Sequence, residues 1–201
     1  MENNKYSNIS VIILAGGQSQ RAETIKGLRK VGTDYWVDLQ ISFYKKLGIK
    51  HIFIGLGFDH EEYINHSKQI KNISYVINQN PENGSFSTLQ TVLNYAIDTK
   101  WDQVILMHID HAIPNNKTIE KLLNTTSCDV IKPTHNGQSG HPIVISHSFC
   151  CDLIRKNPSS TLNIEIKMLS LSQIKWIEVN DASIVENLNT ESRWLKFQKS
   201  I

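Results

Sequence analysis

Short apolar runs rich in β-branched residues recur between longer amphipathic stretches, and this alternation constrains the fold most strongly. The runs at residues 9–14, 51–56, 73–77, 103–109, 129–132 and 142–145 are expected strands. Most do not alternate polar with apolar residues, which is typical of strands covered on both faces of a largely parallel sheet. Residues 36–47, 88–97 and 118–123 have helical spacing. Strand and helix therefore alternate through residue 125, which predicts α/β layering with right-handed crossovers.

The order changes after residue 132. A turn at 135–137 leads into the apolar run at 140–145, which predicts an antiparallel hairpin or an edge strand. Helices are expected at 148–156, 161–170 and 191–199, and a strand at 173–179. At 201 residues, the chain fits one domain over residues 1–201.

Composition excludes several classes of protein. With 40% hydrophobic and 20% charged residues, the chain is expected to be globular, and its net charge of +2 without a dense basic run argues against nucleic-acid binding. The apolar run at 9–15 is too short for a signal peptide or a membrane span, so we expect no membrane partner and a cytoplasmic protein. Cys128, Cys150 and Cys151 lack metal-ligand spacing and are expected to be reduced thiols.

A glycine-rich segment follows the first expected strand. Gly16 and Gly17 allow a sharp turn whose N–H groups can approach a phosphate, and Ser19, Arg21 and Lys26 add a hydroxyl and two cations. The segment matches neither the Walker pattern nor the Gly-x-Gly-x-x-Gly of dinucleotide folds. A Gly-Gly pair alone would be equally consistent with an ordinary tight turn.

Asp110 follows the expected strand at 103–109, at the edge where open α/β sheets bind ligands. A carboxylate there could bind Mg²⁺, or it could cap the next helix or turn. Of its two histidine neighbours, His108 is expected to be buried or to lie behind the site, while His111 could touch a ligand. We assign neither a catalytic role.

Two further segments carry candidate polar residues. Asn187 and Asn189 point the same way in an extended segment, so their carbonyl oxygens could bind Mg²⁺. On spacing alone, however, a cap of the helix at 191–199 by Asn189 or Thr190 is favoured. At residues 83–89, Ser87 or Thr88 is expected to cap the helix at 88–97. The hydroxyls at this helix start could also bind a nucleotide.

Residues 14–21, with Lys26 and the following Gly-Leu, resemble the signature of the nucleotidyltransferases that modify molybdenum cofactor. These form a branch of the nucleotide-diphospho-sugar transferases (GT-A fold). The resemblance implies a three-layer α/β/α sandwich with a mostly parallel mixed sheet. It also implies that Arg21, Lys26 and the loop amides hold the phosphates, and that Asp110 binds Mg²⁺, with Mn²⁺ as a substitute. This chain has Ala22-Glu23 where the family has Met-Gly, and Ala112 where it has proline.

The resemblance extends to other segments. It implies that Asn187 or Asn189 lies near the metal. Residues 84–89 and the Gly-His-Pro at 140–142 are similar to the cytidylyl branch, which implies that His141 lines the acceptor pocket. Other features, including the asparagine form of the C-terminal motif, are similar to the guanylyl branch. The residues expected to bind nucleotide are Leu14, Ala15, Gly16, Gly17, Ser19, Arg21, Lys26, Gly84, Ser87 and Thr88.

The sequence therefore predicts a monomeric or homodimeric nucleotidyltransferase. It is expected to transfer a nucleoside monophosphate from a nucleoside triphosphate, CTP favoured over GTP, to a phosphorylated small-molecule acceptor, releasing pyrophosphate. A molecule resembling molybdenum cofactor is one candidate acceptor. Arg21, Lys26 and Asp110 are its expected catalytic residues. A cytidylyltransferase for a sugar phosphate or another small phosphorylated alcohol is an alternative. A degenerate member that binds nucleotide without turnover is another, which Glu23 and Ala112 suggest, and a sheet protein with an ordinary Gly-Gly turn is a third.

Overall fold

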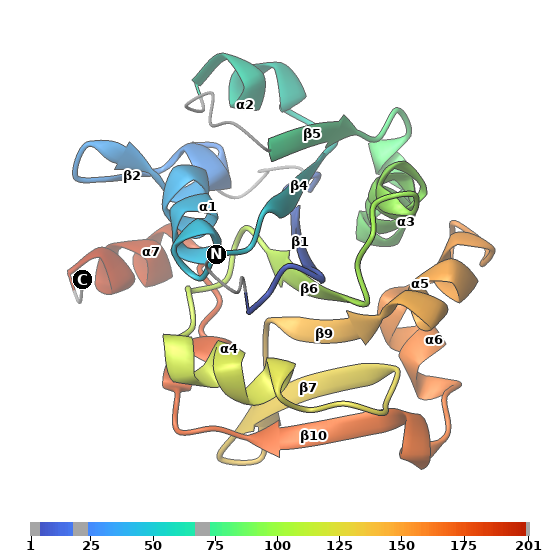
Figure 1. Ribbon diagram of the computed structural model, residues 1–201. Coiled ribbons are helices and arrows are strands. Elements are labelled where there is room, and N and C mark those ends of the chain that lie inside the picture. The colour runs from blue at the N-terminus through green and yellow to red at the C-terminus, as the bar shows by residue number, and fades with distance from the viewer. Residues whose placement is uncertain (1–4, 18–23, 67–72, 200–201) are drawn as a thin grey trace.

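The computed structural model describes residues 5–17, 24–66 and 73–199. Its centre is a mixed eight-stranded sheet with the order β10-β7-β9-β6-β1-β4-β5, and β8 pairs with β7 (Figure 1). The strands of this sheet are β1 (Ile9–Leu14), β4 (His51–Leu56), β5 (Ile73–Ile77), β6 (Gln103–His108), β7 (Val130–His135), β8 (Gln138–Ser139), β9 (Ile143–Ser146) and β10 (Ile174–Glu178). A separate hairpin joins β2 (Lys30–Val31) to β3 (Asp34–Tyr35).

Strand direction sets the edge at which a site can form. β1 pairs in parallel with β4 and β6, β4 with β5, and β7 with β10. Only β9 among the central strands runs antiparallel to its two neighbours, β6 and β7. The carboxyl ends of β1, β4, β6 and β7 therefore point to one edge of the sheet, together with the start of β9.

Helices cover both faces of the sheet (Figure 1). Side chains of β1 alternate between the two: Val11 and Ile13 belong to one buried cluster, and Ile12 and Leu14 to the other. The first cluster packs under α1 (Trp36–Lys46), α4 (Asn116–Leu123) and α7 (Glu191–Gln198). The second packs under α3 (Ser85–Ala96), α5 (His147–Ile154) and α6 (Leu162–Lys167). The predicted three-layer α/β/α sandwich is confirmed.

Most predicted elements appear within a few residues of their expected bounds. Of the two alternatives for the region after residue 135, the antiparallel one is confirmed, because β8 forms a hairpin with β7 and β9 pairs antiparallel with both β6 and β7. β9 is therefore an interior strand and not an edge strand. The predicted start of one helix is wrong. The helix expected at 88–97 begins at Ser85, and its N-cap is Gly84, which makes no side-chain capping bond. Helix α2 (His60–His66) and the β2–β3 hairpin were not predicted.

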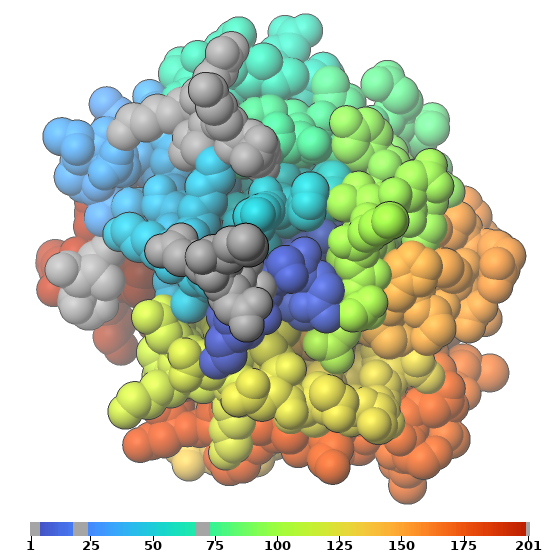
Figure 2. All heavy atoms as spheres, viewed as in Figure 1, coloured from blue at the N-terminus to red at the C-terminus, as the bar shows by residue number. Residues whose placement is uncertain are grey.

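Residues 5–8 precede β1 at the sheet edge opposite the carboxyl ends. Figure 2 shows the N-terminal part of the described chain in blue, with yellow-green and yellow chain beside it. Asn8 joins this edge to β6, because its carbonyl accepts from the Asp102 N–H at 2.8 Å and its Nδ2 donates to Asp102 Oδ2 at 2.6 Å. No helix in the described residues is long and apolar enough to cross a membrane.

Candidate active site

The glycine-rich loop leaves β1 at the carboxyl edge of the sheet. Leu14 and Ala15 are buried, and the Ala15 N–H donates to the Gly55 carbonyl at 2.7 Å. A Cβ at Gly16 would lie 2.9 Å from Thr88 Oγ1, whereas one at Gly17 would meet nothing within 4 Å. The first glycine is therefore required by the close approach of α3. Ser19 and Arg21 lie outside the described residues.

The start of α3 faces this loop. Gly84 has a φ of 89°, which favours glycine, and it opens the helix. The Ser87 hydroxyl donates to the Gly84 carbonyl at 2.8 Å and accepts from Asn78 Nδ2 at 2.9 Å. Thr88 Oγ1 accepts from the same amide at 3.0 Å. Asn78, which was not among the predicted site residues, thus ties both hydroxyls to the end of β5.

Three predicted residues that are distant in sequence meet at the end of β6. Lys26 Nζ lies 3.1 Å from Asp110 Oδ2 and 2.6 Å from Asn189 Oδ1. The ammonium thus bridges a carboxylate and an amide oxygen that converge on one point. The Asp110 side chain does not cap the next helix, whose N-cap is Asn115.

Lys26 is held in place by its neighbours. It begins a short 3-10 helix (Lys26–Leu28), and the N–H of Gly27 donates to the Tyr63 hydroxyl at 3.1 Å. A Cβ on Gly27 would lie 2.5 Å from the Tyr63 ring, so only glycine fits there. Arg29 is 3% exposed and donates to the Leu188 carbonyl at 3.0 Å. Tyr63 and Arg29 were missed because neither stands in a recognisable motif.

The segment at 187–190 is fixed against the end of β6. The Leu188 N–H donates to the Asp110 carbonyl at 2.7 Å. An isolated antiparallel β-bridge pairs the backbones of Asn187 and His111. Asn187 Oδ1 accepts from the backbone N–H of Asn189 at 2.9 Å. The side-chain oxygen of Asn189, Oδ1, faces Lys26. Thr190 caps α7 by accepting from the Arg193 N–H at 3.3 Å, as the capping interpretation predicts.

Three imidazoles surround Asp110. The ring centroid of His141 lies 4.9 Å from that of His108 and 4.5 Å from that of His111. His111 Nδ1 is 3.0 Å from Asp110 Oδ1. A Cβ on Gly140 would lie 2.1 Å from the Ile184 carbonyl oxygen, so glycine is needed beside His141. His141 therefore reaches the neighbourhood of Asp110 from the start of β9.

Electrostatics keep this carboxylate charged and two of the imidazoles neutral. Burial alone raises the pKa of Asp110, but the His111 hydrogen bond and the Lys26 charge outweigh it and hold the pKa well below its usual value. Burial lowers the pKa of His108 to about 4. Burial, with the neighbouring His108 and His111, lowers the pKa of His141 well below its usual value.

The donor set suits a hard divalent cation. Asp110 and Asn189 present oxygens to a common point that already accommodates a positive group, the Lys26 ammonium. Carboxylate and amide oxygens are ligands that Mg²⁺ and Mn²⁺ accept. Within the described ranges, no three His, Cys, Asp or Glu side chains are placed to hold a metal.

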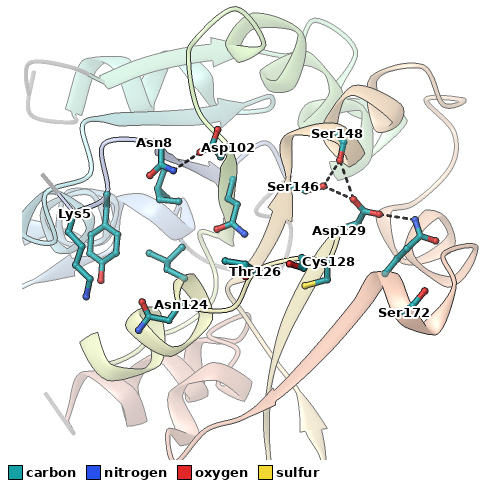
Figure 3. A pocket seen from close by; sticks show the side chains of 16 residues that line it. Lys5, Asn8, Asp102, Asn124, Thr126, Cys128, Asp129, Ser146, Ser148 and Ser172 are labelled. Atoms are coloured by element: carbon teal, nitrogen blue, oxygen red, sulfur yellow. Dashed lines mark hydrogen bonds between the residues drawn. The ribbon is translucent and has the colours of Figure 1, made fainter.

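A cavity of about 660 Å³ lies at the opposite edge of the sheet, where β1, β6, β7 and β10 begin. Figure 3 shows Asp129 in its wall, bonded to Ser146 and Ser148. Asp129 Oδ1 accepts from these two hydroxyls at 2.7 and 3.2 Å, and Oδ2 accepts from Gln173 at 2.7 Å. Its carboxylate is already satisfied, and none of the predicted site residues lines this cavity.

The sandwich, the loop after β1 and the acidic residue at the end of β6 define a nucleotidyltransferase. Residues 11–163 match the family model described as a MobA-like NTP transferase domain. The chain therefore belongs to the MobA-like NTP transferase family.

Solved structures share the fold at low sequence identity. The Mycobacterium sp. strain JC1 homologue of Mycobacterium tuberculosis Rv0371c superposes with a TM-score of 0.80 at 18% identity, covering 97% of each chain. The M. tuberculosis Rv0371c complex with manganese gives 0.78 at 14% identity, covering 97% of this chain and 100% of that one. HddC from Yersinia pseudotuberculosis, complexed with GMP-PN, gives 0.73 at 12% identity, covering 95% and 98%. No curated protein sequence matches the chain.

Proposed function

We propose that the protein transfers a nucleoside monophosphate from CTP, in preference to GTP, to a phosphorylated small-molecule acceptor. The observation that carries the proposal is the meeting of Lys26, Asp110 and Asn189 beside the glycine-rich loop. A cation, a carboxylate and an amide oxygen at this edge suit a bound triphosphate and its metal.

In the proposed reaction an oxygen of the acceptor phosphate attacks the α-phosphorus. A new P–O bond forms as the bond from the α-phosphorus to the bridging oxygen of the β-phosphate breaks, and pyrophosphate leaves with the bonding electrons. No proton transfer and no covalent enzyme intermediate are needed, since the attacking phosphate is already an anion. The protein contributes position and charge, which dominate catalysis of phosphoryl-type transfers.

Each side chain then has a distinct task. The backbone at Gly16 and Gly17, with Arg21, binds the phosphates, and Lys26 moves from Asp110 to the triphosphate when the nucleotide arrives. Asp110 and Asn189 hold Mg²⁺, or Mn²⁺ in its place, and Asn187 orients Asn189. When bound, the metal neutralises charge on the phosphates during transfer. His141 lines the acceptor pocket, while Ser87 and Thr88 position the loop and the nucleotide.

The base and the acceptor are the finer parts of this proposal. CTP is favoured because residues 84–89 and 140–142 resemble the cytidylyl branch. Rv0371c was solved in complex with manganese and HddC in complex with GMP-PN, which supports the use of a divalent metal and of a nucleotide. A molybdenum cofactor-like acceptor fits the family, and a sugar phosphate or another small phosphorylated alcohol is the alternative.

A pyrophosphate-release assay tests the proposal. The four common nucleoside triphosphates are each combined with a panel of phosphorylated acceptors and Mg²⁺ or Mn²⁺. We expect release with CTP above that with GTP, and a loss of at least about 100-fold in Asp110→Ala. Asp129→Ala, at the opposite edge, is the matched control and should retain activity. Undiminished turnover in Asp110→Ala at saturating metal would refute the metal assignment, and nucleotide binding without any turnover would instead indicate a degenerate member.

A further inference from the structure

Lys132 is a half-buried cation in the interior of the sheet that no sequence motif identifies. It lies on β7, whose side chains alternate between the faces: Val130 belongs to the cluster under α3, α5 and α6, and Ile131 to the cluster on the other face. Lys132 is therefore on the face of Val130. His108 is on the same face, because it lies two positions after Leu106 on β6 and Leu106 belongs to the same cluster as Val130.

The ammonium of Lys132 has no counter-charge in the described chain. No hydrogen bond or ion pair to a described residue involves it, whereas Lys26 of the candidate active site is paired with Asp110. Burial lowers the pKa of Lys132, and no described acidic group offsets this effect. Partial burial of an unpaired charge is costly, so such a residue is best explained by an anion that arrives from outside.

Backbone hydrogen bonds hold Lys132 close to His141. The Gly140 N–H donates to the carbonyl of Pro133 at 3.0 Å. Pro133 follows Lys132 in the chain and Gly140 precedes His141, so this hydrogen bond keeps Lys132 and His141 close together. The Lys132 charge contributes to the lowered pKa of His141. His141 Nδ1 is buried and has no hydrogen-bond partner among the described residues. An unpaired ammonium and an unpaired imidazole nitrogen therefore lie near one another, beside the candidate active site.

A tryptophan stands next to Lys132 on the edge strand. Trp176 of β10 is in register with Lys132, so both side chains are on the same face, and Trp176 is 48% exposed. The other three tryptophans, Trp36, Trp101 and Trp194, are only 2%, 5% and 4% exposed. Solvent-sensitive fluorescence of the protein will therefore come mainly from the side chain beside Lys132.

We propose that Lys132, together with His141 Nδ1, binds the phosphate group of the acceptor and so selects phosphate monoesters over neutral alcohols. Lys132 is then a specificity-determining residue of the acceptor side, separate from the cations that bind the triphosphate. The assignment rests on the proposed function, because it names the partner of the nucleotide in the same site.

The test is a binding titration that needs no turnover. Tryptophan fluorescence is followed while glycerol 3-phosphate is added to the protein without nucleotide, with glycerol as the uncharged control. We expect saturable binding of glycerol 3-phosphate alone, about tenfold or more weaker in Lys132→Met because a charge-assisted contact is lost. Lys132→Arg should bind within about threefold of the wild type. Lys175→Met is the matched control, since Lys175 pairs with Ile131 and is exposed on the opposite face.

Several results would overturn the assignment. The assignment is wrong if Lys132→Met binds glycerol 3-phosphate as tightly as the wild type does, or if Lys175→Met loses as much affinity as Lys132→Met. It is also wrong if the wild type shows no saturable binding of glycerol 3-phosphate. Trp176→Phe should abolish the fluorescence change while calorimetry still detects binding. Should Lys132→Met fail to fold, Lys132→Gln carries the same expectation.

Activity separates this assignment from the proposed function. If no nucleotide and acceptor pair releases pyrophosphate but binding still depends on Lys132, the transferase proposal fails and the anion site stands. If pyrophosphate is released and Lys132→Met leaves the KM for the acceptor unchanged, the anion site fails and the transferase proposal stands. An increased acceptor KM with an unchanged nucleotide KM supports both.

Discussion

The Lys26 ammonium occupies the point on which the proposed metal ligands converge, so replacing it should make the metal bind more tightly in the absence of nucleotide. The two charges of the Lys26–Asp110 pair are 3.1 Å apart, with 23% and 19% of the side chains exposed. Unit charges about 4 Å apart attract by about 4 kcal/mol at an effective dielectric constant of about 20, whereas fully exposed pairs contribute about 1 kcal/mol or less. A partly exposed pair lies between these limits.

A metal ion must break this pair and also approach the lysine charge. We therefore expect Lys26→Met to tighten nucleotide-free Mn²⁺ binding by at least about tenfold, which corresponds to about 1.4 kcal/mol. The measurement is Mn²⁺ titration followed by electron paramagnetic resonance. Lys30→Met, a nearby lysine whose ammonium lies 5.8 Å from the Tyr35 ring centroid, is the matched control. Unchanged or weaker Mn²⁺ binding in Lys26→Met would refute the reasoning, and Asp110→Asn should remove the binding in either background.

Three further changes test how the site is supported. Gly140→Ala forces a Cβ to within 2.1 Å of the Ile184 oxygen, so we expect a loss of about 3 kcal/mol in the free energy of unfolding in urea; a wild-type value would contradict the packing argument. Asp181 is buried, and hydrogen bonds from residues 115, 118 and 183 hold its pKa below the usual value despite its burial. Because the unfolded chain binds this proton more readily, the stabilisation is present above about pH 4 and is lost as the pH falls through the folded pKa. Asp181→Asn should be about 2 kcal/mol less stable than the wild type at pH 6, and it should lose less stability than the wild type on acidification to pH 3. Parallel pH profiles of the free energy of unfolding for the two proteins would contradict this. Thr190→Ala removes the cap of α7 and should cost about 1 kcal/mol in thermal unfolding, whereas an unchanged midpoint would show that the cap is dispensable.

The strands were predictable because burial on both faces leaves a continuous apolar run. β1, β4 and β5 have the predicted bounds. The position of β9 was not predictable, since its short apolar run fits an edge as well as an interior place, and only its pairing with both β6 and β7 decides. Helix α2 was missed because its sequence is mostly polar and Tyr63 is its one buried residue.

The candidate site was predictable as residue types and not as geometry. Lys26 and Asn189 are 163 positions apart, and only the crossovers of the sheet bring them to one point. The start of α3 was misplaced because the hydroxyls of Ser87 and Thr88 resemble caps, whereas the positive φ of Gly84 sets the helix start. Lys132 gave no signal, since a lysine at the end of a short apolar run is normally solvated.

Because β9 runs antiparallel to β6 and β7, its start lies at the same sheet edge as the ends of β1 and β6. Two separate segments of the chain therefore contribute side chains to this edge. The loop, Lys26 and the start of α3 come from residues before Asp110, whereas residues 130–146 bring Lys132 and His141 to the same edge from the other side. Because residues 135–140 lie between Lys132 and His141, an exchange there would alter the side of the site proposed for the acceptor and leave Gly16 and Gly17 unchanged. With the proposed acceptor side on one hairpin and the glycine-rich loop on another segment, a change of acceptor would require exchange of the hairpin alone.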